Sequence, residues 1–240
     1  MGFRTALVLL IVVAACGPRP DHEIRISHSP AAAWHRFEQS YKNLTSLALS
    51  GDFSIENEQA YECNLQLLYA APDSFAFLAE GTLGIDLARG AIRGHTGFWE
   101  VPRQGINEEI SPGDLLILPD NDTAIDLEVL VRAVFFFRQT SDYEYRTRSG
   151  SKLNFVRQGG DSLQIIELSR DSATPASQTF ISADDTIRVS YSDWHNQAAG
   201  LAFPHRIDIS STVSGMKITY LIKKSKYNPN IDLSNFLPKS

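Results

Sequence analysis

The spacing of apolar side chains changes from a helical to a strand period near residue 45. Four apolar residues recur at steps of three and four, as one face of a helix requires: Trp34, Phe37, Tyr41 and Leu44. Ser29 and Pro30 precede this pattern as an N-cap residue and a proline at the first helical position. The sequence therefore predicts an amphipathic helix over residues 30–45.

Beyond this helix, apolar and polar residues alternate with a period of two in one segment after another. The alternation is clearest over residues 47–55, 61–69, 187–191 and 216–222. Such segments, joined by short polar turns, predict antiparallel strands with one apolar and one solvated face. Residues 105–122 interrupt the strand pattern, and Asp122-Thr123 then cap a second helical pattern with Leu127 and Leu130 on its apolar face.

The predicted fold class is α+β, with about ten antiparallel strands in one curved sheet. A sheet of this length with an apolar face must curl and be covered, so we expect an incomplete (half) β-barrel covered by helices and loops. Nine inward-facing residues are candidates for lining its concavity: Phe53, Tyr61, Leu65, Leu67, Tyr69, Phe75, Phe77, Tyr191 and Met216. The sequence leaves open whether this concavity is packed solid or holds an apolar pocket for acyl chains.

The first sixteen residues have the features of an export signal. Arg4 is followed by an unbroken apolar run of ten residues, Ala6–Ala15, and then by Cys16. The run is too short for a transmembrane helix, which needs roughly 20 residues. Because small residues precede the cysteine, the segment resembles a bacterial lipobox, and lipidation of Cys16 is expected. The alternative is an ordinary signal peptide with a chance cysteine.

This reading divides the chain into three parts. Residues 1–15 are the expected lipoprotein signal peptide, residues 16–28 the lipid anchor and tether, and residues 29–240 a single domain. The tether segment is rich in proline and charge, without a clear period.

Composition narrows the possible functions. The 240 residues include 22 basic and 28 acidic side chains, a formal net charge of −6, which disfavours nucleic acid as a partner. The hydrophobic fraction of 43% is ordinary for a globular domain. With Cys16 lipidated, Cys63 has no partner for an intramolecular disulfide.

No catalytic or metal-binding motif is evident, so we expect no enzyme activity, no cofactor and no metal. The six histidines lack metal-ligand spacing. Asp193-Trp194-His195 is read as a polar turn, and adjacent residues on an extended chain point to opposite faces. His205 is in phase with inward-facing neighbours and is expected to be structural, and Cys63 to be an inert thiol. A hydrolase using Asp193 and His195 is the least favoured alternative.

The order of features from Trp34 to Tyr220 resembles the bacterial lipoprotein-localisation (LolA/LolB) fold, most closely LolB-like outer-membrane lipoproteins. Individual motifs are short, and their order carries the resemblance. They are Asn43-Leu44 at the end of the tryptophan-bearing helix, Gly51-Asp52-Phe53, Thr82-Leu83-Gly84, Ile85-Asp86-Leu87, Pro204, Ile207-Asp208-Ile209 and Lys217-Ile218-Thr219-Tyr220.

The resemblance implies a function. Family members receive lipoproteins from a soluble periplasmic carrier, hold the acyl chains in a hydrophobic cavity and pass them to the outer membrane. Leu83 matches by position a loop leucine that promotes membrane insertion, although Thr82 stands where the family has proline. The alternative is that Leu83 is a partly buried turn residue. Leu115 and Leu116 are further candidates for membrane insertion or for a lid, and Gly17 is compatible with outer-membrane sorting.

The sequence leaves two other functions open. The protein could bind another envelope lipid or a glycolipid, or it could be a structural or assembly lipoprotein with no transported ligand. For all three functions we expect the protein in the cell envelope, anchored through Cys16 at the outer membrane and facing the periplasm.

Overall fold

A computed structural model describes residues 29–57, 60–111, 114–117, 124–138, 142–196 and 201–233. The predicted signal peptide, Cys16 and the tether lie outside these residues. Leu115 and Leu116 belong to the short strand β7, but their side chains are outside the described part.

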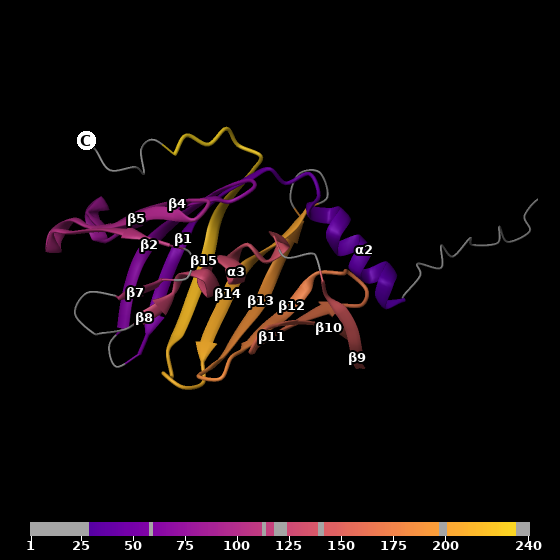
Figure 1. The fold of residues 1–240 in the computed structure, drawn as a ribbon. Coiled ribbons are helices and arrows are strands. Elements are labelled where there is room, and N and C mark those ends of the chain that lie inside the picture. Colours follow the sequence, from indigo (N-terminus) through magenta and orange to yellow (C-terminus); the bar gives the residue numbers. More distant parts are fainter. Residues whose placement is uncertain are drawn as a thin grey trace, which may run out of the picture.

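One large antiparallel sheet dominates the described part of the chain (Figure 1). Its thirteen strands are β1 (Ser46–Glu56), β2 (Ala60–Ala70), β3 (Ser74–Glu80), β4 (Asp86–Arg93), β5 (Thr96–Val101), β6 (Ile106–Ile110), β9 (Glu144–Ser149), β10 (Lys152–Gly159), β11 (Ser162–Ser169), β12 (Pro175–Ile181), β13 (Thr186–Asn196), β14 (Ala202–Ser211) and β15 (Lys217–Tyr227). Two meanders, β1–β6 and β9–β15, join where β1 pairs with β15, so the last strand lies in the middle of the sheet.

The sheet is curved and unclosed, and irregular pairing marks where it bends. The register shifts between Ser50 and Gly51, and again on β10 and β11. Such bulges increase local twist and bend a strand. At Gly51 the two backbones approach so closely that a Cβ would overlap the Leu221 carbonyl oxygen. Glycine is therefore required at this bend.

The helix α2 (Pro30–Tyr41) confirms the first helical prediction, although it ends before residue 45. Ser29 is its N-cap, and its hydroxyl oxygen accepts a hydrogen bond from the Ala32 amide at 3.2 Å. Phe37 and Tyr41 are buried. The indole of Trp34 packs on Phe155 of β10, with ring centroids 4.6 Å apart, which holds the helix against the second meander.

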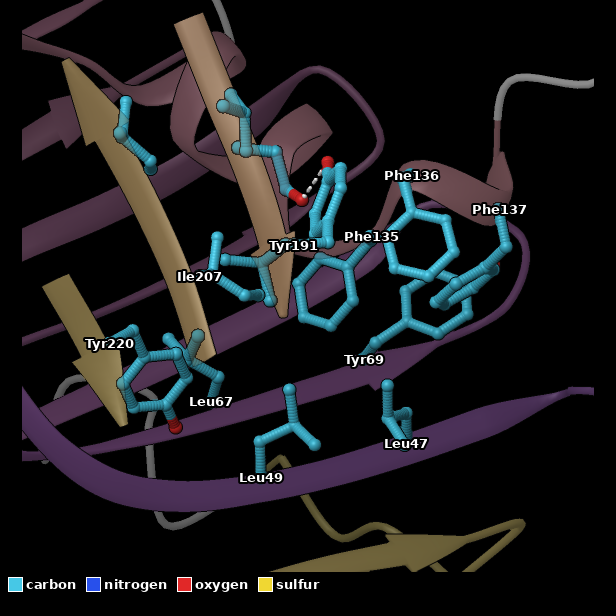
Figure 2. Close-up of a cluster of buried hydrophobic side chains, with 14 of the residues drawn as sticks. Leu47, Leu49, Leu67, Tyr69, Phe135, Phe136, Phe137, Tyr191, Ile207 and Tyr220 are labelled. Carbon is cyan, nitrogen blue, oxygen red and sulfur yellow. Dashed lines mark hydrogen bonds between the residues drawn. The ribbon is translucent and has the colours of Figure 1, made fainter. Parts of the chain in front are cut away.

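A second helical segment lies against the concave face of the sheet (Figure 1). It consists of α3 (Leu127–Val134) and the short 3-10 helix η3 (Phe136–Arg138). Figure 2 shows three successive phenylalanines leaving this segment beside Tyr69 of β2. All three are buried. The Tyr191 hydroxyl donates a 2.7 Å hydrogen bond to the Ala133 carbonyl, which fixes the end of α3 to β13.

The main sheet has more strands than the roughly ten expected. Residues 106–110 form β6 within a segment read as an interruption, and a separate two-stranded sheet pairs β7 (Leu115–Ile117) with β8 (Ala124–Asp126). The reading of Asp193-Trp194-His195 as a turn is wrong, because β13 continues to Asn196 through pairing with β14. No helix in the described ranges has the length and hydrophobicity to cross a bilayer.

Candidate functional site

The concave face of the sheet is filled at one end by aromatic side chains. The Phe136 ring lies 5.0 Å from Tyr191, 5.8 Å from Phe203 and 6.3 Å from Phe37, measured between centroids. Phe135 extends the same cluster to Tyr69, at 5.3 Å. Close-packed rings of this kind leave little free volume. This part of the concavity is therefore core.

The other end of the concavity, under the first meander, contains a cavity of about 320 Å³. This volume is at the lower end of the range of about 300–1,000 Å³ typical of small-molecule sites. Strands β1–β5 form its wall, and Leu127 and Leu130 of α3 cover it. Six of the residues predicted from strand alternation lie on the wall: Phe53, Tyr61, Leu65, Leu67, Phe75 and Phe77.

The other three candidates lie elsewhere in the fold. Tyr69 and Tyr191 belong to the aromatic cluster around Phe135 and Phe136. Met216 is buried just before β15, where its carbonyl accepts a hydrogen bond from the Ser211 amide. Alternation assigned these three side chains to the inward face correctly, but they lie at positions along the strands that are outside the cavity.

Sequence reasoning missed part of the wall. The missed residues include small side chains on β3 and β4, two residues of β5 and two of α3: Ala79, Ala88, Trp99, Val101, Leu127 and Leu130. The two-residue step between Trp99 and Val101 is the signal in the sequence that could have assigned both side chains to the inward face of β5. Phe98, between them, packs instead in a separate buried cluster with Ala76 and Ala91.

A glycine shapes the wall beside Phe77. A Cβ placed on Gly90 of β4 would lie 2.6 Å from Cε1 of Phe77 and 2.7 Å from the Phe98 carbonyl oxygen. The absence of a side chain lets the phenyl ring lie over β4. A larger residue at 90 would push this ring out of its position.

The cavity is closed and apolar at one end and open at the other. Leu65, Leu67 and Phe75 are buried. At the opposite end, Tyr61 is half-buried, and its partner across the β1–β2 pair is Ile55. Three lining residues are exposed, and all three are polar: Glu62, Arg103 and Gln104. The polar side chains of the lining are therefore gathered at the mouth of the cavity, its exposed end.

Cys63, on the same wall, is not activated. Burial raises the pKa of its thiol to about 11, so the sulfur remains protonated at neutral pH. On β15, paired with the lining residue Phe53, Tyr220 donates a 3.1 Å hydrogen bond from its hydroxyl to the Leu65 carbonyl. Burial raises the pKa of this phenol as well. The lining thus offers surface for apolar contact and holds its one thiol in the neutral form.

An exposed leucine stands beside the mouth. Leu83 lies in the 3-10 turn η1 (Thr82–Gly84) between β3 and β4 and is 96% exposed. Its φ of 67° is in the left-handed region, which non-glycine residues rarely adopt. Ile85 is 40% exposed, and a Cβ added to Gly81, before the turn, would lie 3.3 Å from Cδ2 of the lining residue Leu87. The alternative of a partly buried turn leucine is therefore wrong.

Three of the titratable residues considered in the sequence, Asp193, His195 and His205, are brought together away from the cavity lining. His195 Nε2 lies 2.9 Å from Asp193 Oδ1, and the His195 ring stacks on His205 with centroids 4.1 Å apart. Their separation in sequence hid this contact, since His205 is on the neighbouring strand β14.

An open, curved antiparallel sheet with a helical segment on its concave face and an apolar cavity places the described part of the chain in the structural class of half-barrels. The sequence matches no protein-family model and no curated protein. The fold is nevertheless that of the lipoprotein-localisation (LolA/LolB-like) proteins, as three solved structures show.

The three structures are similar over most of this chain. A DUF1329 family protein from Desulfovibrio piger has a TM-score of 0.64 and 9% identity, covering 85% of this chain and 94% of that one. An outer-membrane lipoprotein-sorting protein domain from Vibrio parahaemolyticus has a TM-score of 0.60 and 9% identity, with the same coverage. A LolA superfamily protein from Nitrosomonas europaea has a TM-score of 0.61 and 13% identity, covering 87% and 97%. Identities this low establish the fold and nothing finer.

Proposed function

We propose that this protein is a lipid-anchored receptor of the cell envelope that binds lipoprotein acyl chains in its cavity and passes them to the outer membrane. The anchor would be the lipid on Cys16, and the domain would face the periplasm. Acyl chains would arrive from a soluble periplasmic carrier protein. Binding and release require no covalent step and no cofactor.

The observation that carries the proposal is the apolar cavity, open at one end. If a methylene takes about the volume of a water molecule, ~30 Å³, the cavity of about 320 Å³ holds on the order of ten methylenes. At ~0.8 kcal/mol for each, their transfer from water contributes about 8 kcal/mol before the cost of association. The net affinity is then modest, which suits a protein that must release its cargo.

The position of Leu83 supports a route from the cavity to a bilayer. Its turn is next to the lining residue Leu87, so a membrane contact made by Leu83 and Ile85 would bring the mouth to the lipid surface. Burying one leucine side chain in an apolar medium contributes about 1.5–3 kcal/mol, enough for a transient contact. An acyl chain leaving the mouth there would cross little water.

A second candidate is favoured by the size of the cavity. About ten methylenes is less than a lipoprotein with several chains would bring, so a lipid with fewer chains, such as another envelope lipid or a glycolipid, would place a larger share of its apolar surface in the cavity. We therefore propose this as the alternative.

A transfer assay separates the two. The lipidated full-length protein is reconstituted into vesicles, and a fluorescent triacylated lipopeptide is supplied from a soluble carrier. We expect faster transfer of the lipopeptide into vesicles that contain the protein, and slower transfer when Cys16→Ser protein is added instead. Acceleration of a single-chain lipid but not of the lipopeptide would support the second candidate. No acceleration of either lipid would contradict both.

A further inference from the structure

Three potential metal ligands converge near the end of β13, outside the cavity lining. They are Asp193 and His195 on β13 and His205 on β14. One donor atom from each lies within 4.8 Å of the other two. The Asp193 and His195 side chains are 64% and 51% exposed, and His205 is half-buried, so an ion in solution can reach all three.

The backbone holds the three residues in this arrangement. The pairs Ser192↔Arg206 and Trp194↔Pro204 flank the position where Asp193 stands opposite His205. Asp193 has a φ of +54°, an unusual conformation for a residue with a side chain. The Trp194 ring packs 6.0 Å from Phe136 in the aromatic cluster, which anchors this part of β13 to the core. Strained backbone held by a packed neighbour is common at functional sites.

The donor chemistry is that of a zinc-type site. Zinc binds imidazole nitrogen and carboxylate oxygen at about 2.0–2.2 Å in tetrahedral geometry, so its ligand atoms are separated by roughly 3.3 Å. The 2.9 Å distance between His195 Nε2 and Asp193 Oδ1 is already near this value. Small side-chain rotations that separate the stacked rings of His195 and His205 would aim both imidazoles at one point.

Nearby charge does not oppose a cation. The adjacent cation, Arg206, is engaged by the Asp208 carboxylate through two hydrogen bonds of 2.7 and 2.8 Å. That pairing offsets its charge, while the Asp193 carboxylate supplies negative charge at the cluster itself.

We propose that Asp193, His195 and His205 form a binding site for one divalent metal ion of the zinc and copper class. Three protein ligands leave a fourth coordination position for water or for a donor from another molecule. Mg²⁺ is excluded by preference, since it favours oxygen ligands in octahedral geometry. A bound ion would tie the end of β13 to the start of β14, and because it binds only the folded chain it would raise thermal stability.

Calorimetric titration of ZnCl₂ into the full-length protein tests this. The protein is kept in mild detergent, carries no polyhistidine tag and is first treated with a chelator that is then removed. We expect one Zn²⁺ per chain at this cluster, with affinity reduced at least about tenfold by His195→Ala and by His205→Ala. MgCl₂ should give no binding. Thermal unfolding of each variant without metal checks that the chain is folded, and His195→Gln gives a more conservative change if the alanine variant unfolds.

His95→Ala is the matched control, because His95 is an exposed histidine in the turn after β4. Nitrogen NMR shifts of the imidazoles on adding Zn²⁺ identify the ligands directly, with changes expected at residues 195 and 205 and none at 95. The proposal is overturned if the wild-type chain binds no Zn²⁺. It is equally overturned if the 195 and 205 variants bind Zn²⁺ as tightly as the His95→Ala control.

Discussion

A larger side chain at Ala79 should block ligand binding by filling the cavity. Ala79 of β3 is a partly buried residue of the lining, opposite Leu65 on β2 and Ala88 on β4. In Ala79→Phe, the ring replaces about six methylene-sized groups of ligand. At ~0.8 kcal/mol each, full displacement costs about 5 kcal/mol of binding free energy. A ligand that retreats part of the way toward the mouth still loses about 2 kcal/mol, roughly 30-fold in Kd.

The fold should tolerate this change. The added ring enters existing space, whereas overpacking of a full core costs about 1–3 kcal/mol. We therefore expect the melting temperature of Ala79→Phe to equal or exceed that of the wild type. Ser190→Phe is the control, because Ser190 is exposed on β13 and does not belong to the lining.

Binding is measured as displacement of a fluorescent fatty acid from the domain over residues 29–240, after its cooperative thermal unfolding has been verified. The wild type and Ser190→Phe should bind equally, and Ala79→Phe at least about 30-fold more weakly. Equal affinity of all three proteins, with equal melting temperatures, would refute the assignment of the ligand to this cavity.

Three further changes test other parts of the structure. Leu83→Glu should weaken vesicle binding at least about tenfold without lowering the melting temperature, because a side chain 96% exposed contributes no core contact. The control is Val213→Glu, in the turn between β14 and β15, where Val213 is 71% exposed. An equal loss of vesicle binding in this control would argue against a specific role of Leu83. Gly51→Ala should lower the free energy of unfolding by roughly 2–4 kcal/mol in urea titrations, since its Cβ overlaps the Leu221 carbonyl, and an unchanged midpoint would contradict the close approach. Burial raises the pKa of the Asp185 carboxyl, but hydrogen bonds outweigh this effect and hold the pKa below its usual value. The donors are the side chains of Ser211 and Thr212 and the backbone amides of Val213 and Thr186. The stabilisation from the ionised Asp185 carboxylate is complete above a pH of about 4 and is lost as pH falls through the lowered pKa. In Asp185→Asn, the free energy of unfolding should therefore fall less steeply with decreasing pH in the acid range. An unchanged pH dependence of the free energy of unfolding would contradict this role of Asp185.

The sequence alone located the local elements. The steps between Trp34, Phe37 and Tyr41 gave the helix α2, with its N-cap at Ser29, because helical periodicity and capping are local properties. Alternation likewise identified most strands and their inward faces. It failed for β6, where Asn107, Glu108 and Glu109 are all exposed and leave no apolar phase to read.

The candidate site shows where such local reasoning stops. Alternation assigned both Leu65 and Tyr69 to the inward face of β2, and both are buried there. It could not distinguish a lining residue from one packed under Phe135, because that depends on where the segment α3–η3 crosses the sheet. The contact between His195 and His205 depends in the same way on the register of β13 against β14.

The sequence by itself thus determined a helix followed by a curled sheet with one apolar face, since these follow from periods of 3.6 and 2 along the chain. Only the tertiary structure decided that one end of the concavity is filled by Phe135, Phe136 and Phe137 while the other remains open. It also decided that Leu83 projects beside the open end. The physical reason is that packing and free volume depend on contacts between segments far apart in sequence, which no local pattern records.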